Sequence, residues 1–295
     1  MKYTLFLLMI PLFTFGQDRF DKVEIKSQQL SDNIYMLEGS GGNIAVLTGA
    51  DGTLMIDSQF GELSEKIKSA ISEIATGDIK YLVNTHWHGD HTGGNGNFND
   101  AGATIVAHKN VRERISTDQV MKAFNREVKA KSENYWPEIT FEEGMDLHLN
   151  GQDIMIVHAD NAHTDGDAFV YFTQANVLHM GDVFFKDRFP FIDLGSGGTI
   201  NGYIKAVQAA LMITDSETQI IPGHGKLATQ FDLINYHNML TTMKSRVQHA
   251  TAEGQTIDQM KTAGLDKSFE TWGTGFIAPD SFINTIWTDL DREKQ

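Results

Sequence analysis

The sequence predicts an α/β fold in which two β-sheets lie inside and helices lie outside. Short apolar runs bounded by glycine or Asp-Gly turns are typical of strands, and such runs occur in both halves of the chain. Each half also contains segments whose apolar residues recur at helical spacing. Because both kinds of element have an apolar face to bury, they pack in layers, and the pattern predicts a layered sandwich.

The first half of the chain is expected to contain strands joined by glycine-rich turns and two helical segments. Residues 62–75 place Leu63, Ile67 and Ile71 on one side, which predicts an amphipathic helix. Residues 111–133 are strongly charged and are expected to be largely helical. The expected strands are residues 33–38, 44–48, 53–57, 81–85 and 104–107.

The second half repeats this organisation in outline. Apolar runs again alternate with turn residues before long amphipathic segments follow. The expected strands are residues 145–149, 153–158, 168–172, 177–180 and 219–221. The expected helices are residues 202–213, 229–252, 256–263 and 279–290.

Composition limits the classes of protein that the chain can belong to. It has 295 residues, of which 41% are hydrophobic and 21% charged, enough apolar material for a core in one large domain. Its formal net charge of -15 repels phosphate backbones, and no run of Lys or Arg offsets that charge, so nucleic acid is not an expected partner. The sequence contains no cysteine, which excludes disulfides, thiolate nucleophiles and cysteine-ligated metals.

Residues 1–16 are expected to be a signal peptide, and residues 17–295 a single domain. A basic start precedes an almost wholly apolar run over residues 3–15. That run is shorter than the roughly 20 residues that a membrane span needs. The small residues before Gln17 suit cleavage by a signal peptidase. We therefore expect a periplasmic or secreted protein with no stable membrane anchor after cleavage; a buried N-terminal strand or an uncleaved anchor is the alternative.

A cluster of metal-binding residue types directly follows one of the expected strands. The segment Thr85-His86-Trp87-His88-Gly89-Asp90-His91 holds three imidazoles and one carboxylate. Burying so many polar groups is costly unless something binds them. Histidine nitrogens and carboxylate oxygens suit zinc and its first-row neighbours. The His-x-His-x-Asp-His spacing therefore predicts a metal site, in which the first two imidazoles face one ion and the last two side chains a second.

Three further candidate ligands follow other expected strands. His163 follows the strand over 153–158, Asp182 the strand over 177–180, and His224 the strand over 219–221. Ligands in α/β proteins gather beyond strand ends. Taken alone, Asp182 suits a helix cap and His224 a turn, but several such strand-end sites together favour a shared metal centre.

With these motifs, the chain resembles the metallo-β-lactamase superfamily from about residue 33 to residue 225. The resemblance implies an αββα four-layer sandwich with a dinuclear metal site, and it implies that Asp57 orients the histidine loop. We expect two Zn²⁺ per chain, with iron or manganese as alternative metals. The implied ligands are His86, His88 and His163 for the first metal, Asp90, His91 and His224 for the second, and Asp182 as the bridge between them.

The ligand set also indicates which relatives the chain resembles. Lacking cysteine, it differs from the β-lactamase subclasses that use a cysteine ligand. With both His91 and Asp182, it is similar to glyoxalase II, lactonases and other dinuclear hydrolases of the superfamily. The resemblance implies an exported zinc hydrolase in which a metal-bridging hydroxide, assisted by Asp90 as the catalytic residue, opens a small cyclic amide or ester of the β-lactam or lactone class. A thioester hydrolase of the glyoxalase II type and an iron-dependent persulfide dioxygenase are the alternatives.

A small-molecule substrate is the expected partner, and the segment after Asp182 is the best candidate to contact it. Its phenylalanines surround two basic side chains, which suits an apolar wall with a carboxylate-binding cation. The alternative is that the rings only fill core space. The candidate contacts are Phe185, Lys186, Arg188 and Phe191.

Overall fold

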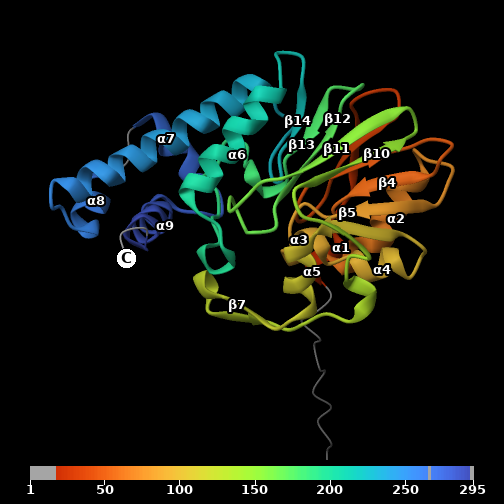
Figure 1. Cartoon of the computed structure of the whole chain (residues 1–295), viewed down its shortest axis with the longest axis horizontal. Coiled ribbons are helices and arrows are strands. Elements are labelled where there is room, and N and C mark those ends of the chain that lie inside the picture. The colour runs from red at the N-terminus through yellow and green to blue at the C-terminus, as the bar shows by residue number, and fades with distance from the viewer. Residues whose placement is uncertain (1–17, 265–266, 293–295) are drawn as a thin grey trace, which may run out of the picture.

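Two β-sheets stack against each other with helices on both outer faces (Figure 1), which confirms the predicted sandwich. The computed structural model describes residues 18–264 and 267–292, so the expected signal peptide over residues 1–16 lies outside the described residues. Within the described part of the chain, no helix combines the length and apolar character needed to cross a bilayer.

The first sheet has seven strands in the order β1-β2-β3-β4-β5-β6-β9. Strands β1 to β4 pair antiparallel, whereas β4, β5, β6 and β9 run parallel. Helix α2 (Ser64–Ser72) packs its apolar side on the outer face of this sheet. The strands are β1 (Lys26–Gln29), β2 (Ile34–Glu38), β3 (Ile44–Leu47), β4 (Thr53–Ile56), β5 (Ile79–Val83), β6 (Thr104–His108) and β9 (Ile139–Phe141).

The second sheet has five strands in the order β10-β11-β12-β13-β14. All its neighbours pair antiparallel except β13 and β14, which are parallel. The strands are β10 (Gly144–Leu149), β11 (Gln152–His158), β12 (Ala168–Phe172), β13 (Val177–His179) and β14 (Gln219–Ile221). The helices of this half are α6 (Ile200–Ile213), α7 (Gln230–Ala252), α8 (Ile257–Ala263) and α9 (Pro279–Arg292).

Alternating side chains explain how the layers pack. On β2, Ile34 and Met36 belong to the apolar layer between the sheets, together with Ile156 of β11. Leu37 points the other way and joins Ile67 of α2. Because successive side chains of a strand point to opposite faces, one short strand contributes to two apolar layers.

The expected helix over residues 111–133 is wrong in most of its length. The helix ends where Thr117 adopts an extended backbone, and the following hairpin turns through Asn125, whose φ is 46°. Asparagine tolerates this left-handed conformation better than most residues do. The many charged residues of this segment indicated that it is exposed, but they did not indicate whether it is helical. The observed elements are α5 (Lys109–Ser116), β7 (Gln119–Met121) and β8 (Arg126–Val128).

Two strands of the first sheet were also not expected. β1 is exposed along its whole length, and β9 has only one buried residue. Edge strands of this kind lack the apolar run that marks a buried strand. The other expected strands and helices are present, with their ends shifted by a few residues.

A stacked histidine pair connects the two sheets away from the metal-binding motif. The rings of His108 and His158 lie 3.9 Å apart and nearly parallel. Burial, reinforced by His158 and Lys109 and opposed by Asp165, lowers the pKa of His108 to about 4. The sequence had indicated no partner for either histidine.

The lowered pKa of His108 predicts that the folded protein loses stability in acid. Between pH 6.5 and about 4 the unfolded His108 binds a proton that the folded form does not, so stability is full above pH 6.5 and falls as the pH falls through this range. We expect His108→Asn, which keeps a side-chain acceptor for the start of α5, to reduce the stability loss over this range by about 1–3 kcal/mol. Urea unfolding at pH 7 and pH 4.5 measures the difference. An equal acid-induced loss in the variant would contradict the prediction.

Candidate metal centre

The first group of candidate ligands comprises His86, His88, His163 and Asp182, all buried, with ligand atoms within 4.8 Å of one another. The two nearest imidazoles approach closely, since His163 Nε2 lies 2.8 Å from His88 Nδ1. Asp182 Oδ2 lies 3.6 Å from His163 Nε2 and 3.9 Å from His86 Nε2. Residues from the loops after β5, β11 and β13 therefore converge on one point.

The second group comprises Asp90, His91 and His224, whose ligand atoms also lie within 4.8 Å of one another. His224 Nε2 lies 3.3 Å from Asp90 Oδ2 and 3.4 Å from His91 Nε2. The other carboxylate oxygen of Asp182, Oδ1, lies 3.1 Å from His91 Nε2 and 3.4 Å from His224 Nε2. Asp182 therefore faces both groups, and the structure brings together all seven residues predicted as ligands.

Close backbone approach explains two glycines of this centre. A Cβ on Gly223 would lie 2.0 Å from Asp182 Oδ1, and a Cβ on Gly42 would lie 2.1 Å from the His91 ring. Both distances are far too short for any side chain. Gly223, directly before His224, and Gly42, in the glycine-rich turn before β3, thus leave room for the ligand side chains.

An unpaired atom tests whether these residues fit metal ions. His86 Nε2 is buried without a hydrogen-bond partner. Buried polar atoms are normally paired, and an unpaired one costs about 1–3 kcal/mol. Imidazole nitrogens facing one another at hydrogen-bond distance around a carboxylate form a donor set suited to divalent cations. The seven residues fit two such ions.

Electrostatics differ between the two groups. Burial lowers the pKa of His86 and lowers that of His163 to about 4, helped in each case by neighbouring histidines. In the second group burial also opposes the charged imidazole, but nearby carboxylates, Asp182 first, outweigh it and raise the pKa of His224 to about 9 and that of His91 well above its usual value. Without metal, His86 and His163 therefore favour the neutral imidazole, and His91 and His224 hold protons that a cation would displace.

Hydrogen bonds orient the rings from behind. Asp57 Oδ2 lies 2.7 Å from His91 Nδ1, and Asp57 also accepts hydrogen bonds from the backbone N–H and hydroxyl of Thr85. The Phe191 carbonyl lies 2.7 Å from His163 Nδ1. Asp57 thus occupies the orienting position that the resemblance implies, one side chain behind the histidine loop.

The contact between Asp193 and His88 was not predicted from the sequence. Its Oδ2 lies 3.1 Å from His88 Nε2 and accepts a 2.6 Å hydrogen bond from the Ser196 hydroxyl. The backbone N–H groups of Gly195 and Ser196 also donate to Asp193 Oδ1. An Asp three residues before a Ser is a common turn pattern, so the sequence indicated a turn but not contact with a histidine 105 residues away.

A cavity of about 600 Å³ opens onto the metal centre, and His88, Asp90, Asp182 and His224 line part of it. Three of the predicted substrate contacts, Phe185, Arg188 and Phe191, also line it. Lys186 does not, because its amine binds the Leu227 carbonyl and the Asp232 carboxylate. Other lining residues were not predicted from the sequence; they include Arg19, Phe60, Phe124, Arg126 and Phe276.

Aromatic rings gather at one side of this cavity. Phe124 lies 5.1 Å from Phe191 and 5.5 Å from Phe276 between ring centroids. Phe124 and Phe276 are 42% and 73% exposed, which is unusual for such large apolar side chains. Because they come from the β7–β8 turn and from the segment before α9, sequence proximity could not have grouped them with Phe191.

Comparisons with known proteins match this chain to one family model and to curated proteins. The chain matches the family model described as the Metallo-beta-lactamase superfamily over residues 37–224. It is 26% identical over 150 residues to "Hydroxyacylglutathione hydrolase" of Pelagibacter ubique (strain HTCC1062), covering 50% of this chain and 52% of the relative. It is 24% identical over 215 residues to "Beta-lactamase-like protein 2 homolog" of Caenorhabditis elegans, covering 67% of this chain and 63% of the relative. The chain thus spans between about half and just under two thirds of these curated relatives.

Solved structures share the fold at low sequence identity. A metallo-beta-lactamase from Pontibacter korlensis is 18% identical, with a TM-score of 0.59, over 74% of this chain and 99% of that one. The sec-alkylsulfatase Pisa1 from Pseudomonas sp. is 14% identical, with a TM-score of 0.68, over 90% of this chain and 50% of that one. Both likenesses concern the fold alone.

Proposed function

The chain belongs to the metallo-beta-lactamase superfamily, and we propose that it is a metal-dependent hydrolase of small cyclic amides or esters. The convergence of seven His and Asp side chains at the floor of an open cavity carries this proposal. A purely structural metal site is closed, whereas here Asp90 and His224 line accessible space.

The residues divide into holding and reacting groups. His86, His88 and His163 would hold one ion, Asp90, His91 and His224 the other, and Asp182 would contact both. Bound there, divalent ions lower the pKa of water and polarise a substrate carbonyl.

Asp90 is the group best placed to move a proton. Its side chain is 29% exposed and lines the cavity, whereas that of His91 is fully buried. In hydrolysis a water oxygen bonds to the carbonyl carbon while the bond to the leaving nitrogen or oxygen breaks. Asp90 would accept the proton that water loses and deliver it to the leaving group.

The cavity supports a substrate of mixed character. Phe124, Phe191 and Phe276 form an apolar side, and Arg188 offers a cation near the ligands. A β-lactam or a lactone with an apolar substituent suits this arrangement. The similarity to a hydroxyacylglutathione hydrolase favours a thioester as the second candidate.

Acid release tests the reaction class. Each proposed hydrolysis releases a proton near neutral pH, so one weakly buffered assay covers a β-lactam, an acyl-lactone and a thioester. We expect metal-dependent acid release from the lactam or the lactone. Release from the thioester alone would favour the second candidate, and silence across the panel would contradict a hydrolase acting on these bonds.

Zinc is the metal that we propose for both positions, because histidine predominates among the ligands. Elemental analysis of protein purified without added metal should find two zinc ions per chain. One tightly held iron, with oxygen consumption, would instead favour the persulfide dioxygenase alternative.

We also propose that the protein is exported. The support is the basic start and the apolar run over residues 3–15, followed by small residues before Gln17. Mass measurement of the protein from a periplasmic extract should give a chain beginning at Gln17. A chain of full mass confined to the cytoplasm would contradict export.

Asp193 should tune metal affinity through His88. Replacing Asp193 by Asn keeps the shape but removes the charge that orients and polarises the imidazole. We expect metal affinity to fall about tenfold to a hundredfold, as is typical when a partner behind a ligand is lost. Competition with a zinc chelator measures this change. The matched variant Asp160→Asn, whose carboxylate is 82% exposed, should retain wild-type affinity.

A further inference from the structure

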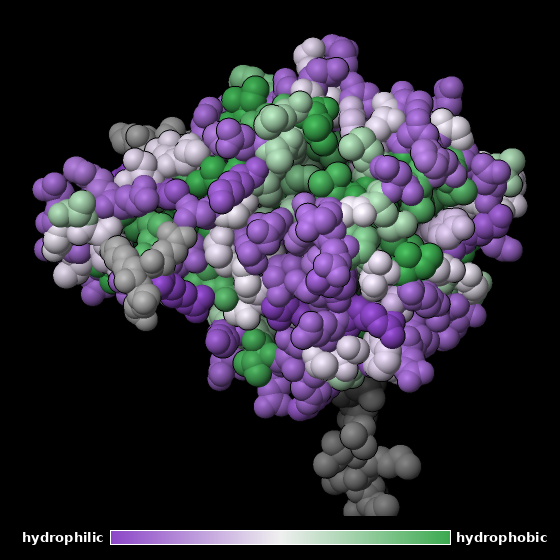
Figure 2. All heavy atoms as spheres, viewed as in Figure 1, coloured by the Kyte–Doolittle hydropathy of each residue, from purple (hydrophilic) through white to green (hydrophobic). Residues whose placement is uncertain are grey.

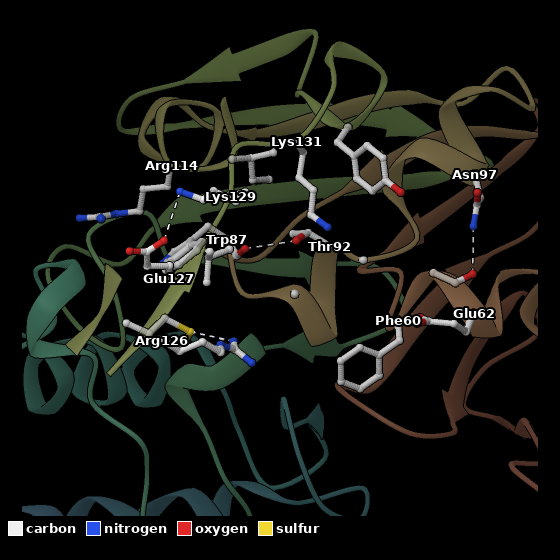
Figure 3. Close-up of a pocket in the computed structure, with 17 residues that line it drawn as sticks. Phe60, Glu62, Trp87, Thr92, Asn97, Arg114, Arg126, Glu127, Lys129 and Lys131 are labelled. Atoms are coloured by element: carbon white, nitrogen blue, oxygen red, sulfur yellow. Dashed lines mark hydrogen bonds and ion pairs between the residues drawn. The ribbon is translucent and has the colours of Figure 1, made fainter. Parts of the chain in front are cut away.

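A second cavity of about 660 Å³ lies beside the metal centre, under the β7–β8 hairpin (Figure 3). Four residues, Phe60, Gly89, Met121 and Arg126, line both this cavity and the one that opens onto the metal ligands. The two spaces are therefore neighbours, and one molecule can extend from the first into the second. We call this second cavity the side pocket.

The side pocket is rich in cations, although the whole chain carries a formal charge of -15. Its charged lining residues are Arg114, Arg126, Lys129 and Lys131 on the basic side and Glu62 and Glu127 on the acidic side. Positive charge gathered in a hollow of an acidic protein attracts anions to that place.

Existing ion pairs account for only two of the four cations. Arg114 binds Asp165 through two 2.7 Å hydrogen bonds. Lys129 contacts Asp118 at 3.0 Å and Glu127 at 3.2 Å. These pairs leave the other two basic side chains as the groups available to a ligand.

Arg126 and Lys131 form no ion pair with any carboxylate among the described residues. The guanidinium of Arg126 donates a hydrogen bond to the Met121 sulfur, a weak acceptor, and the amine of Lys131 lies over the Tyr135 ring. In Figure 3 the Lys131 side chain extends into the hollow. Both cations thus keep their capacity to bind an anion.

The wall of the side pocket also contains an unpaired donor. Trp87, between the candidate ligands His86 and His88, is 4% exposed, and its indole N–H has no hydrogen-bond acceptor. The Trp87 Nε1 atom has almost no accessible surface in this structure, so an oxyanion would reach it only after the ring shifts. The oxyanion would then pair a donor that is costly to leave unpaired. This observation is independent of the cations and indicates the same kind of ligand.

We propose that the side pocket binds a carboxylate or similar oxyanion on an arm of the substrate, through Arg126, Lys131 and the Trp87 indole. The substrate then carries its scissile bond at the metal centre, an apolar group against Phe124 and Phe191, and an anionic arm under the hairpin. The identity of the molecule rests on the proposed hydrolase function, whereas the anion site itself does not require turnover.

The anion site is tested on the zinc-loaded protein by NMR. With tryptophan labelled by ¹⁵N, the indole signal of Trp87 is the one that Trp87→Phe removes. Glutarate is expected to shift this signal saturably, and its neutral analogue glutaramide is not, because a charged acceptor makes the stronger hydrogen bond. The double variant Arg126→Gln/Lys131→Gln should bind glutarate about tenfold more weakly. The control pair Lys205→Gln/Lys244→Gln removes equal charge from α6 and α7 and should bind as the wild type does.

The outcomes separate the anion site from the reaction. An unmoved Trp87 signal, or equal glutarate affinity in Arg126→Gln/Lys131→Gln, overturns the site. For any panel compound that is hydrolysed, adding a carboxylate to the arm should lower KM about tenfold in the wild type and not in the double variant. Hydrolysis without this preference overturns the substrate assignment, whereas a silent panel contradicts the hydrolase proposal while the NMR result still decides the anion site.

Discussion

Replacing Asp90 by Asn should reduce kcat about a thousandfold without unfolding the protein. The carboxylate lies beside His224 and lines the cavity, where we propose that it accepts a proton from water and passes it to the leaving group. Proton transfer by a positioned side chain typically contributes 10²–10⁴-fold. An amide of the same size removes that function but still fits the space. Because the side chain is partly exposed, its loss should change the melting temperature of the metal-free protein little.

Two measurements distinguish a chemical role of Asp90 from a loss of metal. Elemental analysis should show that Asp90→Asn retains at least the ion held by the first group, since none of those ligands is changed. Titration with excess zinc should not restore turnover. Asp160→Asn, with the same loss of charge at an exposed position, should keep wild-type kcat. Full activity of Asp90→Asn would show that proton transfer occurs elsewhere.

The sequence indicated which candidate ligands lie together because they follow buried strands. His86 and His224 each stand just beyond an apolar run, and such runs fix where a strand ends. β13 and β14 pair in parallel, so the carboxyl ends that precede Asp182 and His224 meet at one edge of the second sheet. Local pattern and tertiary position are therefore tightly linked for these residues. The same link explains why both central sheets could be predicted.

The residues around the ligands could not be predicted in this way. Asp193 reaches His88 through a loop, and Phe276 reaches Phe124 across the cavity mouth, in both cases over long sequence separations. Loop conformation depends on the packing of the whole protein rather than on a local period. Lys186 illustrates the converse, because it stands in the predicted substrate segment but its amine binds Asp232.

The β7–β8 hairpin shows a third kind of limit. Its residues are mostly exposed, so no apolar period marked it as a pair of strands. Yet this hairpin supplies Arg126 and lies above Trp87, and both line the side pocket. Figure 2 shows that hydrophilic side chains cover much of one face of the molecule. In such regions the composition predicts exposure but not conformation, so the residues that line the side pocket could not be identified from the sequence.

Removing the metal should abolish turnover and lower the melting temperature by about 10 °C. Without cations, His86 Nε2 stays buried and unpaired, and His163 Nε2 faces His88 Nδ1 at 2.8 Å. A ligand present at a thousand times its dissociation constant stabilises the native state by about 4 kcal/mol. For a domain of this size, each kcal/mol corresponds to roughly 2–4 °C. Calorimetry of zinc-loaded and chelator-treated protein measures the difference.

A variant that lacks the bridging carboxylate separates metal stabilisation from other effects of the chelator. In Asp182→Asn the amide weakens contact with both groups, so zinc should raise the melting temperature much less than in the wild type. Chelation should then change the variant little. Asp165 lies outside both groups and pairs with Arg114, so Asp165→Asn should keep the full response to zinc even if its own stability falls. An equal response to zinc in Asp182→Asn and wild type would mean that the stabilising ions bind elsewhere, because no other carboxylate in the described part of the chain joins the first group.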